Sequence, residues 1–110
     1  DLAESLLSTD ESGFRKTFRK SAIKRAKRSG FLRNICIALG NWGAPAAVTT
    51  LLRALSDIEP LVRGHAAWAL GQIGSSSARS ALSERLSSEE DAWVKTEISA
   101  ALEAQDSSGL

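Results

Sequence analysis

Basic side chains gather in a short stretch just before an apolar segment. The stretch from 24 to 34 reads KRAKRSGFLRN, and the apolar residues 35–39 follow it directly. A helix beginning near Gly30 would expose free N–H groups and partial positive charge at its N-terminus, with Lys27, Arg28 and Arg33 around it. A phosphate would bind the N–H groups and the basic side chains together. The stretch therefore predicts a phosphate site at a helix junction, and the alternative interpretation is a solvated basic linker.

The distribution of charge along the chain favours the phosphate site. The net charge is +1, yet residues 12–56 contain ten lysines and arginines and no acid. From residue 57 to residue 110, nine acids outnumber four bases. The N-terminal part of the chain is thus expected to attract polyanions, whereas the C-terminal part is not.

Length and composition describe a small domain. A chain of 110 residues is long enough for one core, and the absence of methionine at every position, including the first, predicts an excised or processed piece. No run has transmembrane length and no signal-peptide pattern occurs, so a membrane partner is not expected. Cys36 is the single cysteine, which excludes an internal disulfide and favours a reducing compartment. We expect a soluble, cytoplasmic domain.

An internal repeat organises most of the chain. The segments ICIALGNWG at 35–43, AAWALGQIG at 66–74 and ISAAL at 98–102 align with offsets of 31 and 32 residues. A period of this length is typical of a solenoid built from stacked helix pairs. The paired glycines at 40 and 43, and at 71 and 74, are expected to form the turns that end a helix.

Apolar spacing places the helices. Residues 48–55 and 78–86 predict the first helices of two pairs, with Pro45 at the start of the earlier one, and residues 31–40, 62–73 and 94–102 predict the second helices. A further helix at 14–23 is expected to lead the array, pair with 31–40, and carry Arg15, Lys16, Arg19 and Lys20 on its exposed face. The prediction is an all-α solenoid of about three helix pairs, with residues 1–11 a linker or the tail of a preceding domain, 12–104 the repeat domain, and 105–110 a frayed tail.

Individual residues offer little catalytic chemistry. His65 is the only histidine and lacks an adjacent nucleophile, acid or second imidazole, which favours a structural role. Cys36 sits at an apolar position of a predicted helix, and Trp68 lies in a predicted helix whose apolar residues are typical of a core. Both side chains are expected to pack in the interior. Trp42 lies in a turn and is the better candidate for stacking on an unpaired base. Arg63 either pairs with Asp57 or Glu59 or extends the basic surface.

Two parts of the sequence resemble known families. The run VRGHAAWALGQIG at 62–74 resembles HEAT-like repeats of the phycobilisome-lyase type. The run FRKTFRKSAIKR at 14–25, followed by GFLRN at 30–34 and ALGN at 38–41, resembles the C-terminal part of epoxyqueuosine reductases, which complete queuosine at the wobble position of tRNA. The runs EPLVR at 59–63 and WALG at 68–71 fit the same family, so the resemblance covers roughly residues 12–104.

The resemblance implies a tRNA-facing HEAT-like domain of a larger oxidoreductase. That enzyme would use cobalamin and two iron–sulfur clusters, held by parts that precede this segment. A cluster site needs several closely spaced cysteines, which Cys36 alone does not supply. We therefore expect no cofactor, metal or catalytic residue in this chain. The resemblance implies RNA contacts at Lys24, Arg25, Arg28 and Arg33, and the complete set of RNA-binding candidates comprises Arg15, Arg19, Lys24, Arg25, Lys27, Arg28, Arg33, Asn34, Trp42 and Arg63.

The leading hypothesis is capture of tRNA by its phosphates, with catalysis on a preceding domain of the same chain. That domain and tRNA are the expected partners, and self-association through exposed solenoid ends is a further possibility. The alternative is a protein-interaction scaffold, the commonest use of helical solenoids. An autonomous enzyme and a bilin-handling role find less support in the residues. The acid-free run from 12 to 56 separates the first hypothesis from the second, because a scaffold does not need it.

Overall fold

Helices account for nearly all of the described chain. The computed structural model describes residues 11–108, with side chains from Lys20 to Gln105. This part contains α2 (Glu11–Trp42), the short 3-10 helix η1 (Pro45–Ala47), α3 (Val48–Leu55), α4 (Pro60–Ile73), α5 (Ser76–Ser88) and α6 (Ala92–Ser108). Residues 11–108 contain no strand, and the expected all-α class is confirmed. The predicted role of residues 1–10 lies outside the described residues.

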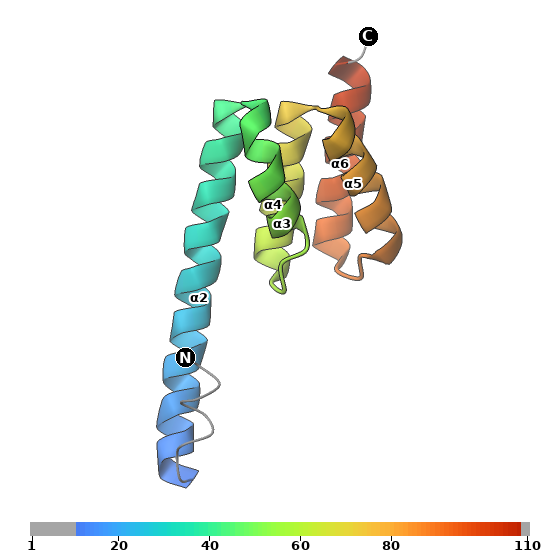
Figure 1. Ribbon diagram of the computed structural model, residues 1–110. Helices are drawn as coiled ribbons and strands as arrows, with labels where there is room; N and C mark the ends of the chain where they lie inside the picture. The colour runs from blue at the N-terminus through green and yellow to red at the C-terminus, as the bar shows by residue number, and fades with distance from the viewer. Residues whose placement is uncertain (1–10, 109–110) are drawn as a thin grey trace.

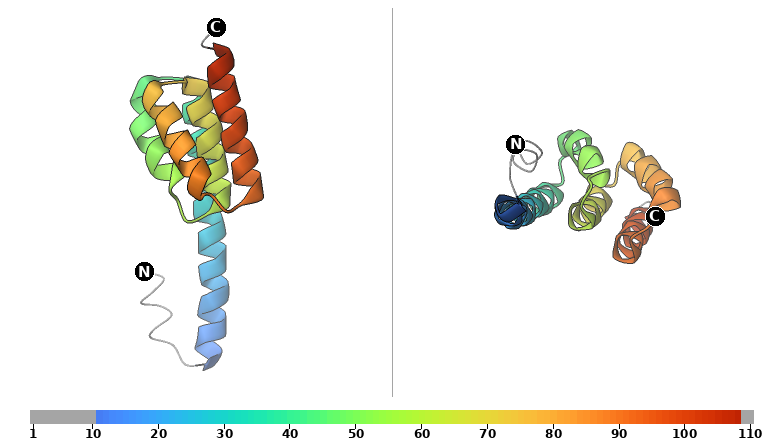
Figure 2. Two further views of the ribbon diagram at one scale, coloured as in Figure 1. Left: turned by 90° about the vertical axis from the view of Figure 1, so that its right-hand side faces the viewer. Right: turned by 90° about the horizontal axis from the view of Figure 1, so that it is seen from below.

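The helices form two layers (Figure 1). Seen from below in Figure 2, α2, α4 and α6 lie side by side in one layer, and α3 and α5 lie in the other. Each of α3 and α5 packs against the helix that follows it in the chain, and α4 is flanked by α2 and α6. The predicted pairs α3/α4 and α5/α6 are therefore present, and the solenoid is confirmed.

The predicted pairing of residues 14–23 with residues 31–40 was wrong. Both stretches belong to α2, which runs without interruption through Ser29 and Gly30 for 32 residues. A glycine inside a helix costs only about 1 kcal/mol, and the neighbouring lysines, arginines and alanines favour helix. Packing offsets that cost, because Ser29 is buried and Cys36 joins the core shared with α3 and α4. No helix begins near Gly30.

The turns follow local signals in the sequence, with one correction. Pro60 occupies the first turn of α4, and the Ser75 hydroxyl accepts a hydrogen bond from the Ala78 N–H at 3.1 Å to cap α5. Gly43 and Gly74 have φ values of 71° and 72° and form the expected helix ends. Gly40 and Gly71 were also expected in turns, but they lie inside α2 and α4, where their missing side chains let neighbouring helices approach.

The N-terminal half of α2 extends beyond the other helices (Figure 1). The repeat helices pack mainly against its C-terminal half, and the longest dimension of the molecule is 60 Å while the other two are 26 and 17 Å. At the other end of the chain, α6 continues to Ser108, and the frayed tail expected from residue 105 does not begin there. The buried side chain of Gln105 belongs to this extension.

Two substitutions at Gly30 test the continuity of α2. A Cβ atom at this position would lie 3.7 Å from Nη2 of Arg33, which is an ordinary contact. Gly30→Ala is therefore expected to raise the free energy of unfolding by about 1 kcal/mol, whereas Gly30→Pro is expected to lower it by about 3 kcal/mol. Urea denaturation followed by circular dichroism measures both. A helix junction at this residue would instead make the proline variant as stable as the alanine variant.

Candidate nucleic-acid interface

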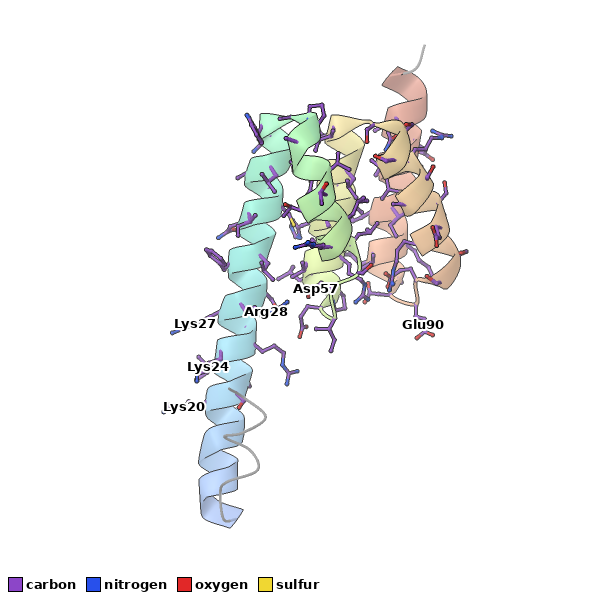
Figure 3. The ribbon with its side chains drawn as sticks, in the orientation of Figure 1. Lys20, Lys24, Lys27, Arg28, Asp57 and Glu90 are labelled. Carbon is purple, nitrogen blue, oxygen red and sulfur yellow. The ribbon has the colours of Figure 1, made fainter. Side chains whose placement is uncertain are left out.

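Three lysines share one exposed face of α2. Lys20, Lys24 and Lys27 are spaced at i, i+4 and i+7, which places them on one side of a helix. Figure 3 shows them on the side of α2 that points away from α3–α6. No described carboxylate forms an ion pair with any of the three. The result is a row of cations open to solvent, hereafter the lysine face.

Two large apolar side chains interrupt the lysine face. Ile23 is 51% exposed and Phe31 is 66% exposed. Their spacing from Lys20, Lys24 and Lys27 places them among these lysines along the helix. The sequence interpretation included Lys24 and Lys27 but left Lys20, Ile23 and Phe31 out of the candidate set. Lys20, Ile23, Lys24, Lys27 and Phe31 are spaced at i, i+3, i+4, i+7 and i+11. In one continuous helix this spacing places all five side chains on the same face, so it would have identified the three omitted residues.

Arg25 and Arg28 point to a different side of the molecule. Arg28 donates two hydrogen bonds to the Asp57 carboxylate, at 2.6 and 3.2 Å, from α2 to the turn before α4. This contact lowers the pKa of Asp57 and raises the pKa of Arg28. Arg25 lies 3.9 Å from the Glu59 carboxylate. These two candidates therefore fasten α2 to the next repeat.

Arg63 is part of a polar cluster inside the molecule. Its guanidinium donates to both Glu89 carboxylate oxygens, at 2.8 and 2.9 Å, and to the carbonyl oxygens of Asp57 and Ile58. The Arg63 side chain is 11% exposed and that of Glu89 is fully buried. Arg63 therefore forms an ion pair, which was one of its two predicted roles. Its partner is the Glu89 carboxylate and not the predicted carboxylate of Asp57 or Glu59.

Glu89 receives more contacts than its pair with Arg63. Arg85 donates to it at 3.0 Å, and the Asp91 N–H donates to it at 3.0 Å. These hydrogen bonds, led by those from Arg63, hold the pKa of Glu89 at about 2 although burial acts in the opposite direction. The carboxylate stays ionised at neutral pH and links α4, α5 and the turn before α6.

The remaining candidates are spread along α2. Arg33 is half-buried and donates from Nε to the Asn34 side chain at 3.2 Å. Trp42 ends α2 and is 64% exposed, in contrast to Trp68, whose ring lies where a Gly40 side chain would be. The backbones of Arg15 and Arg19 lie in the projecting half of α2, and their side chains lie outside the described residues. The predicted phosphate site at a helix N-terminus is absent, because α2 continues through it.

The isolated histidine and cysteine have structural surroundings. His65 Nδ1 lies 2.8 Å from the Leu61 carbonyl oxygen, and the imidazole packs against Trp93 with ring centroids 5.5 Å apart. Cys36 is 2% exposed, and burial raises the pKa of its thiol to about 11. Within residues 11–108 no three histidine, cysteine or acidic side chains gather as a metal site would require. This donor set does not fit an iron–sulfur cluster.

Comparison with known proteins identifies the family to which this chain belongs. The family model for HEAT repeats matches residues 19–103. The chain belongs to the HEAT repeat family. In this HEAT repeat domain, the matched range covers the C-terminal three quarters of α2, all of α3, α4 and α5, and most of α6.

Several relatives of the HEAT repeat domain are epoxyqueuosine reductases, in agreement with the expected resemblance. The domain is 29% identical to that of Bacillus subtilis over 110 residues, covering 99% of this chain and 28% of the relative. It is 32% identical to that of Listeria monocytogenes, covering 86% of this chain and 25% of the relative. An uncharacterised protein in the gldA 3′ region of Geobacillus stearothermophilus is 34% identical to the domain, covering 84% of this chain and 44% of the relative.

A solved structure supports the same relationship. The crystal structure of a selenomethionine-labelled epoxyqueuosine reductase matches with a TM-score of 0.63 and 34% sequence identity, covering 66% of this chain and 20% of that one. The HEAT repeat domain thus spans less than half the length of the relatives named here. No helix in the described part is long and apolar enough to cross a membrane.

Proposed function

We propose that this HEAT repeat domain binds tRNA as part of an epoxyqueuosine reductase-like enzyme, with the lysine face of α2 against the phosphate backbone. The observation that carries the proposal is the alignment of Lys20, Lys24 and Lys27 on one exposed face, free of pairing with described acids. In this proposal the reduction, the cobalamin and the iron–sulfur clusters belong to other parts of the enzyme, and the domain holds the substrate RNA.

The chemistry of the lysine face suits phosphate groups. Along one face of a helix, residues at i, i+4 and i+7 place charges at intervals of about 5–6 Å. Lysine binds phosphate as a mobile point charge, which gives affinity but little sequence discrimination. Recognition would therefore depend on the shape of the RNA and on salt, as for most binding of structured RNA.

The continuous helix changes the role of each candidate residue. Lys24 and Lys27, joined by Lys20, contact phosphates in this proposal, and Arg15 and Arg19 extend the charge along the projecting half of α2. Arg33 and Asn34 lie further toward Trp42, the exposed ring that would stack on an unpaired base. Arg25 and Arg28 add to the local potential while holding α2 on the next repeat, and Arg63 acts inside the fold.

The salt dependence of tRNA binding tests the proposal. Fluorescence anisotropy with a tRNA of the queuosine type, at about 50 and 200 mM salt, gives the slope of log K against log salt. Replacing Lys20, Lys24 and Lys27 together by alanine is expected to flatten that slope by about 2–3 units, because three phosphate contacts are lost. This triple variant removes only exposed side chains, so its free energy of unfolding should lie within about 0.5 kcal/mol of that of the unmodified chain.

A matched variant separates local contacts from total charge. Arg53 and Lys95 are exposed bases on α3 and α6, away from the lysine face. Changing both to alanine should alter the salt slope by well under one unit. The proposal fails if the folded domain does not bind tRNA at about 50 mM salt, or if the triple variant behaves like this control. Either result would favour the protein-interaction scaffold, for which the exposed Ile23 and Phe31 are the supporting observation.

A further inference from the structure

An aromatic ring lies next to the lysine face of α2. Phe31 follows Lys20, Lys24 and Lys27 at i+11, i+7 and i+4, which places it on the same side of the helix. Its side chain is 66% exposed, although phenylalanine is among the residues most often buried. Packing within the described residues therefore does not account for the ring.

The same side of α2 continues past Phe31 without charge. Asn34, Ala38 and Trp42 follow Phe31 at i+3, i+7 and i+11, and all three are exposed. Trp42 brings a second ring to this side, about 16 Å further along the helix. Ala38 is small and leaves the surface between the two rings open. The exposed side of α2 thus has a cationic part, the lysine face, and an aromatic part.

The two parts suit different groups of one RNA. Lysine ammonium groups bind phosphates, whereas an aromatic ring binds the flat face of a base. Bases inside a duplex are stacked on their neighbours, so protein rings stack on bases of loops, bulges and ends. The Cβ atoms of Lys27 and Phe31, at i and i+4, lie about 5–6 Å apart. One nucleotide can therefore contact the ammonium group with its phosphate and the ring with its base.

Charge favours RNA over an ordinary protein surface as the occupant. A partner that covers Phe31 also covers the ammonium groups of Lys24 and Lys27, because the three side chains are neighbours on the helix. These lysines form no ion pair with described acids, and residues 12–56 contain no acid. The partner must therefore bring negative charge and a flat apolar surface to the same place. An RNA strand with an unpaired nucleotide brings both.

We propose that Phe31 stacks on an unpaired nucleotide of the bound RNA, next to the phosphates that the lysine face holds. This inference rests on the proposed function and adds to it the kind of RNA, a strand that leaves its pairing between Lys27 and Phe31. Arg33 donates from Nε to the Asn34 side-chain oxygen at 3.2 Å, which leaves the Asn34 amide N–H groups to donate to a base edge. The paired part of the RNA lies toward Lys20 and the unpaired part toward Trp42.

Two RNAs of equal charge test the proposal. One is a hairpin with an unpaired loop, and the other is a blunt duplex with the same number of nucleotides. Binding to the complete 110-residue chain is measured by fluorescence anisotropy at about 50 mM salt. Phe31→Ala is expected to weaken hairpin binding by about 5- to 150-fold, because stacking on one base is lost. Duplex binding should change by less than about twofold, because the duplex offers no free base to the ring.

Further variants separate stacking from apolar contact. Phe31→Leu keeps an apolar side chain without a ring and should weaken hairpin binding nearly as much as Phe31→Ala, whereas Phe31→Trp should preserve it. The salt slope of Phe31→Ala should stay within about 0.5 units of that of the unmodified chain, because no phosphate contact is lost. Ile58→Ala is the matched control: Ile58 is 81% exposed, lies in the turn before α4, and should not affect either RNA when replaced.

The outcomes distinguish this inference from the proposed function. Stacking by Phe31 is refuted if Phe31→Ala leaves hairpin binding unchanged, if it weakens both RNAs equally, or if Phe31→Leu binds the hairpin as tightly as the unmodified chain. In each case a flattened salt slope of the Lys20, Lys24 and Lys27 triple variant would still support tRNA binding. If the folded chain binds neither RNA nor tRNA, both proposals fail, and a protein partner becomes the better occupant of this side of α2.

Discussion

Replacing Glu89 by glutamine is expected to lower the free energy of unfolding by about 3–5 kcal/mol. The change keeps the size of the side chain but removes the anion that Arg63 and Arg85 share. Because the Glu89 side chain is fully buried and that of Arg63 is 11% exposed, the guanidinium loses its counter-ion where water reaches it poorly. Chemical denaturation monitored by circular dichroism measures the loss.

Glu90→Gln is the matched control. Glu90 is the adjacent acid in the sequence and is exposed, and its substitution should change the unfolding free energy by no more than about 0.5 kcal/mol. Similar losses in the two variants would show that the effect of Glu89→Gln comes from net charge rather than from the buried cluster.

The same cluster makes stability depend on pH. The pKa of Glu89 is about 2 in the folded chain, below its ordinary value of 4.5. A lowered carboxyl pKa contributes stability that is fully present above about pH 4.5 and is lost as pH falls toward 2. Asp57, whose pKa is lowered by Arg28, acts in the same direction. Over this pH range the Glu89→Gln variant should lose less stability than the unmodified chain.

Replacing Gly71 by leucine is expected to cost about 3 kcal/mol or more. A Cβ atom at this position would lie 2.8 Å from Cβ and 2.9 Å from Cα of Ala101, so that the first added atom already meets the backbone of α6. Neither neighbour can rotate away, and α4 and α6 would have to separate, which is the costly form of overpacking. Urea denaturation measures the loss.

Gln72→Leu provides the comparison for Gly71→Leu. It introduces the same residue one position later, at an exposed site of α4, and should leave the unfolding free energy within about 0.5 kcal/mol. Equal stabilities of the two variants would mean that α4 and α6 are further apart than the structure places them.

Periodic patterns predicted most of the helices. The apolar spacing and the offsets of 31 and 32 residues located α3, α4 and α5 closely, since each helix buries one stripe, and they located the start of α6 but not its end at Ser108. The same reasoning failed at Ser29–Gly30, because a glycine preceded by a serine is equally compatible with a helix end and with a helix interior held by packing. Continuity of α2 depends on α4, which local sequence does not display.

The candidate site was predictable only in part. Net charge and the acid-free run identified the basic part of the chain, but not which bases stay free. Arg28 pairs with Asp57 across 29 positions, and Arg63 pairs with Glu89 across 26. Such pairs follow from how repeats stack, so their members resemble free surface charges in the sequence. The position of Lys20 on the lysine face became evident only once α2 proved to be a single helix.

The two ion pairs also bear on how such a chain can grow. Asp57 and Glu89 are 32 residues apart, each accepts an N–H from the residue two positions later, and each receives an arginine from the inner helix of the preceding repeat. The segment from α3 through α4 therefore carries the acid for one junction and the arginine for the next. A gene duplication copying this segment would generate a self-complementary junction, and arrays could lengthen or shorten in evolution without new interface chemistry.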